Sequence, residues 1–167
     1  MPSSTQKKTT SPLWRNEEKN METVDILTLA MAAAALLVSI YTYIKSVNHD
    51  RKRDTLDAYN TLQEQALDNI NNYTGLELKN CLESGNKELE RSFGKWLARI
   101  EHFCVGVNEG IYDKKTVYEL AHGYLDLNIW YKLQPLINKK QSGKAEAYYT
   151  NFEKVVRWMK AESEKKK

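Results

Sequence analysis

The stretch that decides the fold runs from Ile26 to Ile44 and reads ILTLAMAAAALLVSIYTYI. Its nineteen residues include no charged side chain. At the rise of an α-helix they would span about 28 Å, close to the hydrocarbon thickness of a bilayer. Tyr41 and Tyr43 stand near the C-terminal end, where aromatic side chains commonly meet the membrane–water interface. The sequence therefore predicts a transmembrane helix over residues 25–45.

This apolar stretch has two other interpretations. An Ala-rich helix can also form the buried core of a soluble protein, and that alternative stays open. A cleaved signal peptide has a shorter apolar region, close to the start of the chain. Here 25 mostly polar and charged residues come first, so a retained single-pass anchor is favoured.

The basic residues that flank the anchor predict its orientation, because cytoplasmic flanks carry more Lys and Arg. The near N-terminal side offers Arg15 and Lys19, whereas residues 45–53 offer four basic side chains. We expect the larger, C-terminal part in the cytoplasm, at a bacterial inner membrane. If Lys7 and Lys8 are counted as well, the two sides have the same number of Lys and Arg residues, and the charge difference disappears.

Outward from the anchor, the chain divides by composition into three further segments. Residues 1–24 are mostly polar and are expected to be a disordered tail. Residues 46–160 are long enough for one domain with a real core. Residues 161–167 are expected to be a frayed, charged C-terminal tail.

Apolar side chains at helical spacing predict four or five helices in residues 46–160, and the fold class is therefore all-α, a helical bundle behind a membrane anchor. The anchor helix is expected to continue toward Tyr73 and to end before Gly75. Apolar side chains on two opposite faces predict one central helix over residues 113–136, which Pro135 should kink or restart. The other expected helices cover residues 76–83, 86–110 and 145–159.

Composition and motifs argue against several classes of function. The net charge of +3 is modest and comes partly from Lys165–Lys167, so no nucleic-acid partner is expected. The seven glycines form neither a phosphate-binding loop nor a dinucleotide fingerprint. Cys81 and Cys104 lie in no metal-binding array and are expected to be reduced, with Cys104 buried. No cofactor, metal site or catalytic residue is predicted, and the protein is not expected to be an enzyme.

A few polar and aromatic side chains nevertheless invite a functional reading. Glu101, His102 and His122 are the residues that a hidden hydrolase or ligand sensor would use. His102 is expected to face solvent or a partner, whereas His122 stands four residues before Asp126, within hydrogen-bond reach. Possible interaction residues, with packing against a neighbouring helix as the alternative, are Trp130, Trp158 and His102.

Small residues recur four apart within the anchor. This spacing lets two helices approach closely in lipid, although an Ala-rich composition produces it by chance as well. The possible self-association residues are Ala30, Ala34, Ala35 and Ser39.

The stretch WLARIEHFCVGVNEGIYDKKTVYELAHGY, followed by WYKLQPLI and YYTNFEKVVRWM, resembles the family catalogued as domain of unknown function 4760. The most specific part is GVNEGIYD, residues 106–113. The resemblance covers roughly residues 25–160 and implies an anchored helical module, bacterial or phage-related, with no known activity. The motif also has a physical reading as a structural corner: Gly110 ends one helix, Ile111 covers the turn and Asp113 caps the next.

The leading hypothesis is a membrane-anchored interaction module, an adaptor or a subunit of a membrane complex. Its expected partners are the lipid bilayer and either another protein or a second copy of the chain. The alternatives are a membrane-acting effector, for example in antiphage defence, and the hidden hydrolase or ligand sensor.

Overall fold

A computed structural model of the chain describes the backbone of residues 12–142 and 149–166. It describes the side chains of the same residues except 12–24, 81, 82 and 140. The described residues are helical apart from short turns, and no strand occurs among them. The all-α class predicted from the sequence is therefore confirmed. The chain divides into two compact units, Met1–Ser46 and Val47–Lys167.

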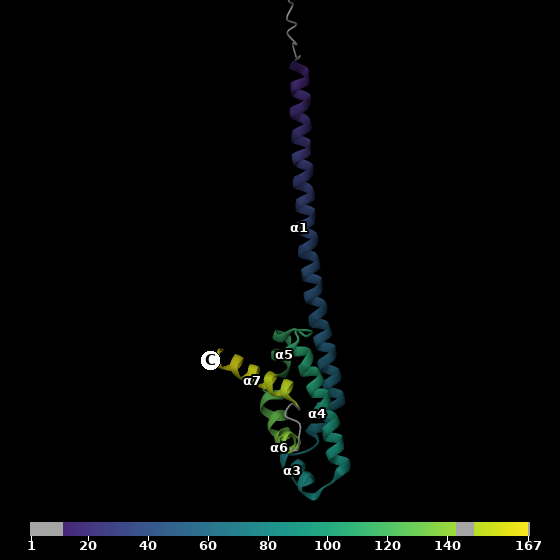
Figure 1. Cartoon of the computed structure of the whole chain (residues 1–167), viewed down its shortest axis with the longest axis vertical. Coiled ribbons are helices and arrows are strands. Elements are labelled where there is room, and N and C mark those ends of the chain that lie inside the picture. The colour runs from purple at the N-terminus through teal and green to yellow at the C-terminus, as the bar shows by residue number, and fades with distance from the viewer. Residues whose placement is uncertain (1–11, 143–148, 167) are drawn as a thin grey trace, which may run out of the picture. The chain divides into compact units, whose positions relative to one another are not determined.

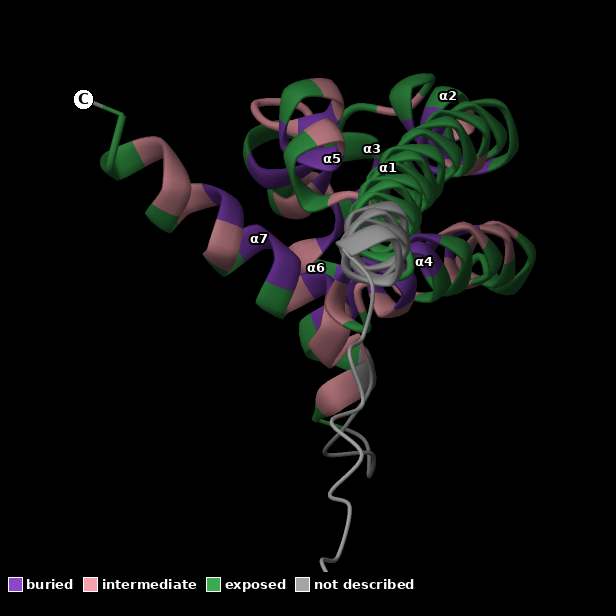
Figure 2. Ribbon diagram, turned by 90° about the horizontal axis from the view of Figure 1, so that it is seen from above, coloured by how far each residue is buried: buried purple, intermediate pink, exposed green. Residues whose placement is uncertain are grey.

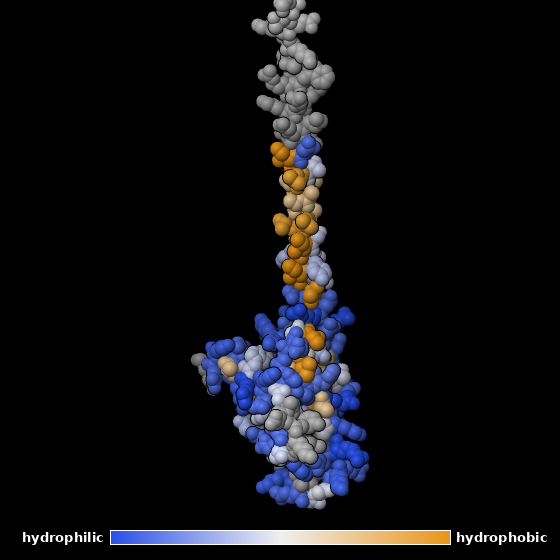
Figure 3. All heavy atoms as spheres, viewed as in Figure 1, coloured by the Kyte–Doolittle hydropathy of each residue, from blue (hydrophilic) through white to orange (hydrophobic). Residues whose placement is uncertain are grey.

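The apolar stretch lies in the long helix α1, which runs from Pro12 to Leu62. Side chains from Ile26 to Ile44 are all exposed, and Figure 3 shows this part of the helix as mostly orange, with paler patches between. Within the described part of the chain, one helix is long and apolar enough to cross a membrane. Its most apolar 18-residue window has a mean hydropathy of 1.9, and none of that window is buried.

The start of α1 corrects the boundary of the predicted N-terminal tail. The helix begins at Pro12, so residues 12–24 are helical instead of disordered. Proline is well suited to the first position of a helix, and residues 13–24 contain no Gly or Pro. They are also rich in the good helix formers Leu, Arg, Glu, Lys and Met. Residues 1–11 lie outside the described part of the chain.

The C-terminal part of α1 belongs to the second unit and continues beyond Leu62. A π-helical turn, η1 (Gln63–Leu67), joins it to α2 (Asp68–Asn71). In this turn the Asp68 N–H donates to the carbonyl of Gln63, five residues back, so the turn holds one residue more than an α-helical turn. The prediction of one long helix that ends before Gly75 is confirmed.

The remaining helices follow in chain order, and short turns join those from α2 to α6 (Figure 1). Asn86 accepts a hydrogen bond from Leu89 N–H and begins the α4 helix, which packs against η1, α3 and α7. Three of the expected helix positions, near residues 76–83, 86–110 and 145–159, are matched by helices, although 143–148 lie outside the described residues. The elements are α3 (Gly75–Ser84), α4 (Lys87–Asn108), α5 (Lys114–Ala121), η2 (Leu125–Ile129), α6 (Trp130–Gln141) and α7 (Thr150–Glu164).

The predicted single helix over residues 113–136 is wrong. The chain leaves the helical conformation at His122, and Gly123 has a φ of +84°, which favours glycine strongly. One of the two opposed apolar faces therefore belongs to α5 and the other to η2 and α6. Pro135 lies inside α6 without ending it, contrary to a restart. Because Pro135 is exposed, water can satisfy the backbone carbonyl that its missing N–H leaves free.

The end of α7 also differs from prediction. The helix continues to Glu164, so most of the expected charged tail is helical. Lys165 pairs with Glu162 at 3.1 Å, and Ala161 adds helix propensity in the same turn.

The apolar faces of the second unit meet in one core, seen as the purple faces in Figure 2. Cys104 is fully buried there, as predicted, and its burial raises the pKa of the thiol well above the ordinary value. The side chain of Cys81 lies outside the described residues. Among the largest fully buried side chains are Phe93, Leu97, Ile100, Leu125, Ile129, Leu133, Phe152 and Met159.

Candidate functional site

The corner between α4 and α5 begins where Gly110 takes a φ of +72°. The N–H groups of Ile111 and Tyr112 then donate to the carbonyl of Gly106, at 2.9 and 3.2 Å. Asp113 ends the corner by accepting a hydrogen bond from the Thr116 N–H at 2.9 Å. This arrangement satisfies backbone groups at the end of one helix and at the start of the next.

Ile111 does not cover this corner, in contrast to the sequence expectation. Its side chain is 61% exposed, and Tyr112 folds inward in its place. The Tyr112 ring stacks on Phe103 with ring centroids 5.1 Å apart. It also lies so close to Gly106 that a Cβ at position 106 would overlap the ring. The absence of a side chain at Gly106 therefore leaves the space that the Tyr112 ring occupies.

Thr55 ties the corner to α1. This fully buried side chain accepts a hydrogen bond from the Asp113 N–H at 2.8 Å and donates to the Arg51 carbonyl at 2.7 Å. Thr55 was not among the predicted functional residues because it stands among charged residues in the sequence. Its spacing from Tyr59 and Leu62 nevertheless places it on the buried stripe of α1.

The electrostatics of the corner centre on Asp113. Hydrogen bonds from the Thr116 hydroxyl and N–H lower the pKa of the Asp113 carboxyl below its ordinary value of 3.8, against the raising effect of partial burial. Lys52 and Arg51 lower the pKa further. The charged form is therefore the one that suits the folded corner.

Glu101 acts as a helix cap from a neighbouring helix. Its carboxylate accepts hydrogen bonds from the N–H groups of Asn151 and Phe152, at 3.0 and 2.8 Å, and from the Asn151 side-chain amide at 2.9 Å. The N-cap residue of α7, Tyr149, provides no side-chain cap, so Glu101 supplies the negative charge that this helix end favours. Asn108 adds a hydrogen bond to the Asn151 side chain at 3.0 Å.

His122 lies in a third environment. Its ring stacks on Tyr118, with centroids 4.6 Å apart, and its Nδ1 lies 3.1 Å from the Asp126 carboxylate. Asp126 is almost completely buried and also accepts a hydrogen bond from the Gly123 N–H at 2.6 Å. The expected contact between His122 and Asp126 is present, but it stabilises the break between α5 and η2 instead of the side of one helix.

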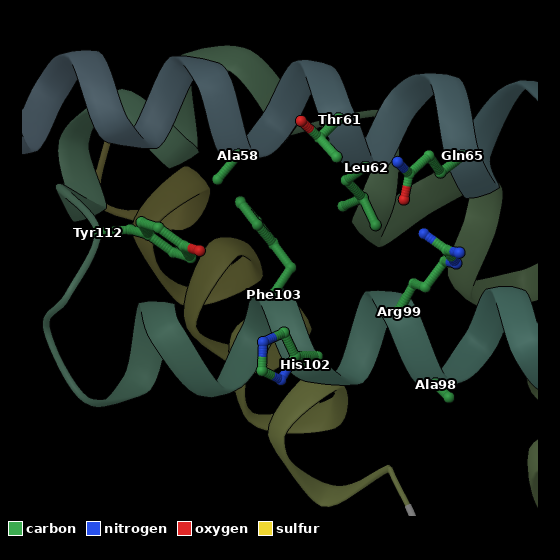
Figure 4. Close-up of a pocket in the computed structure, with 9 residues that line it drawn as sticks. All are labelled: Ala58, Thr61, Leu62, Gln65, Ala98, Arg99, His102, Phe103 and Tyr112. Carbon is green, nitrogen blue, oxygen red and sulfur yellow. The ribbon is translucent and has the colours of Figure 1, made fainter.

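Glu101 and His102 are neighbours in sequence but point to different surroundings. His102 is exposed and lines a cavity of about 380 Å³ between α1 and α4, which we call the α1–α4 cavity (Figure 4). Glu101, His102 and His122 therefore make three separate sets of contacts and form no common site. The cavity is lined by Ala58, Thr61, Leu62, Gln65, Ala98, Arg99, His102, Phe103 and Tyr112.

The polar groups of the cavity come from both helices. Figure 4 shows the Arg99 guanidinium of α4 beside the Gln65 amide of η1, with Phe103 and Tyr112 toward the other end. Arg99 and His102 are three residues apart, on one face of α4. Neither has a hydrogen-bond or ion-pair partner among the described residues, and no carboxylate lines the cavity.

The two tryptophans considered as interaction residues are both half-buried. Trp130 meets Phe152 edge to face, with ring centroids 5.2 Å apart. Trp158 meets Tyr118 in the same manner at 6.1 Å. Two hydrophobic side chains near Trp130 in the sequence are more exposed than Trp130 itself: Leu127 at 54% and Tyr131 at 56%.

The anchor's small residues present a smooth, exposed surface. The Ser39 hydroxyl donates to the Ala35 carbonyl at 2.8 Å within the same helix, so Ser39 behaves as a small residue there. Self-association through Ala30, Ala34, Ala35 and Ser39 stays a prediction. Within the described residues no three His, Cys, Asp or Glu side chains gather in a way that could hold a metal ion.

Comparison with known proteins identifies the family. The pattern of the domain of unknown function 4760 (DUF4760) matches residues 29–159, which include most of the apolar stretch and all of the corner. The chain therefore belongs to this family. No curated protein and no solved structure matches this chain.

Proposed function

We propose that this member of the domain of unknown function 4760 family is a single-pass membrane protein that holds a protein-binding helical module at the cytoplasmic face of a bacterial inner membrane. The observation that carries the proposal is the exposed, uncharged stretch Ile26–Ile44, which takes no part in the core of the second unit. A soluble protein does not leave nineteen consecutive apolar and small residues in water without cost, whereas a bilayer covers them.

The orientation is supported by the basic residues after the stretch. Lys45, Arg51, Lys52 and Arg53 follow it within nine residues, against Arg15 and Lys19 on the near N-terminal side. An excess of Lys and Arg favours the cytoplasmic side of the membrane. The second unit would then lie in the cytoplasm.

The binding role is supported by the exposed pair Leu127 and Tyr131. The two side chains stand four residues apart, where neighbours on one helix face meet. Lys160 lies 5.0 Å from the centroid of the Tyr131 ring. An apolar pair beside a cation suits the aromatic and charged contacts that protein interfaces use as anchors.

Photocrosslinking in native membranes tests the binding role. The crosslinking residue benzoylphenylalanine replaces Tyr131 in the full chain, and Leu76, which is 67% exposed on α3, is the matched control position. A discrete heavier adduct from position 131, absent from position 76, would support the proposal. Adducts that do not depend on position, or none at either position, would contradict it. An adduct at twice the chain mass would identify the partner as a second copy.

A further inference from the structure

The α1–α4 cavity holds two basic side chains, Arg99 and His102, that have no ion-pair or hydrogen-bond partner among the described residues. The carboxylate next to His102 in sequence, Glu101, is held by the first turn of α7.

The walls of the cavity are apolar and firmly packed. Phe103 is 4% exposed and contacts both Tyr112 and Tyr59, at ring-centroid distances of 5.1 and 6.1 Å. Leu62 is 5% exposed and faces it from α1. A bound molecule would therefore meet a preformed apolar wall on one side and the Arg99 guanidinium on another.

The π-helical turn η1 forms part of the α1 wall. It supplies Gln65, which lies beside Arg99 (Figure 4). A π-turn widens a helix locally and occurs often at functional sites. The Gln65 amide has both a donor and an acceptor with which to orient a polar ligand group.

From this arrangement we propose that the α1–α4 cavity binds a small amphipathic anion, a carboxylate or phosphate monoester carried on an aromatic or short aliphatic body. The anionic group lies between Arg99, Gln65 and His102, and the apolar body lies against Leu62, Phe103 and Tyr112. A volume of about 380 Å³ falls in the range of small-molecule pockets. The site lies wholly in the second unit, so it does not depend on the proposed membrane anchoring.

Ligand-observed fluorine NMR tests the proposal with defined probes. The full chain in zwitterionic detergent is titrated against 4-(trifluoromethyl)benzoate, 4-(trifluoromethyl)phenyl phosphate and the neutral 4-(trifluoromethyl)benzyl alcohol. Arg99→Gln removes the charge, Ala98→Trp fills the cavity mouth from an exposed position, and Arg91→Gln is the matched control on the same helix. Partitioning of each probe into micelles is common to all variants.

We expect at least one anion to bind the wild-type chain and the Arg91→Gln variant equally, and more tightly than the alcohol. Arg99→Gln should weaken that binding about tenfold or more, because a charge-assisted contact is lost. Ala98→Trp should abolish it. The proposal is overturned if Arg99→Gln and Arg91→Gln bind alike, or if the alcohol binds as tightly as both anions. Circular dichroism of each variant confirms that it is folded.

Discussion

At the scale of single residues, the most informative contact is the one between Glu101 and α7. Replacing Glu101 with Ala would leave two N–H groups and the Asn151 amide without their acceptor. We expect a loss of about 1–3 kcal/mol in the free energy of unfolding. Partly buried donors that lose their acceptor in the folded state are no longer compensated for their desolvation. Denaturant unfolding of the full chain in detergent measures this loss.

The control for Glu101→Ala is the next residue along the chain. His102 is exposed and contacts no described partner, so His102→Ala should change the free energy of unfolding by no more than about 0.5 kcal/mol. Equal stability of the two variants would show that Glu101 does not hold α7.

Asp113 makes the stability of the corner depend on pH. Its folded pKa is lowered, so the contribution of its charge is fully present above the ordinary value of 3.8 and is lost as the pH falls through the folded pKa. Asn can still cap a helix. Asp113→Asn should therefore remove only the pH-dependent part of the contribution of this residue to the free energy of unfolding.

We expect the difference in the free energy of unfolding between the wild-type chain and Asp113→Asn to decrease as the pH is lowered. At neutral pH the wild-type chain should exceed Asp113→Asn in stability, and the gap should close as the pH falls below about 4. Unfolding curves recorded across this pH range measure the gap. A constant gap at every pH would rule out the titration of Asp113 as its cause.

At the scale of elements, the sequence was sufficient for most helices because their signals are local. The apolar stripe, the Asn86 cap and the Gly110 turn each depend on neighbouring residues, and α4 lies where they predict. The break after α5 was missed because a lone glycine in a helical pattern is often tolerated. The buried carboxylate of Asp126 stabilises the break. From the sequence alone, Asp126 is expected to be a charged residue on the surface of a helix, because its hydrogen-bond partners are not known. The α1–α4 cavity was not predictable either, because its walls come from residues about forty positions apart.

Two glycines provide a matched test of that break. Gly123→Ala forces a Cβ onto a φ of +84° and should cost about 1–2 kcal/mol. Gly94→Ala, inside α4 with open space around it, should instead stabilise the chain by about 0.5–1 kcal/mol. Thermal unfolding followed by circular dichroism distinguishes these outcomes. Two changes of the same sign would contradict the account of the break.

At the scale of the whole molecule, the chain combines a core complete within Val47–Lys167 with an apolar stretch that contributes nothing to it. Charged and polar side chains cover the surface of the second unit, whereas residues 26–44 expose no charged side chain. This contrast is the central reason for assigning a membrane role, and it makes topology the property that matters most.

The direct measurement is protease accessibility of a C-terminal tag after Lys167, in the full chain expressed in a bacterial host. The account predicts that alkaline extraction leaves the protein in the membrane pellet. It predicts further that protease removes the tag in inverted inner-membrane vesicles but not in intact spheroplasts. A tag removed in spheroplasts and protected in inverted vesicles would reverse the proposed orientation. Recovery of the intact chain in the soluble fraction would contradict the membrane anchor itself.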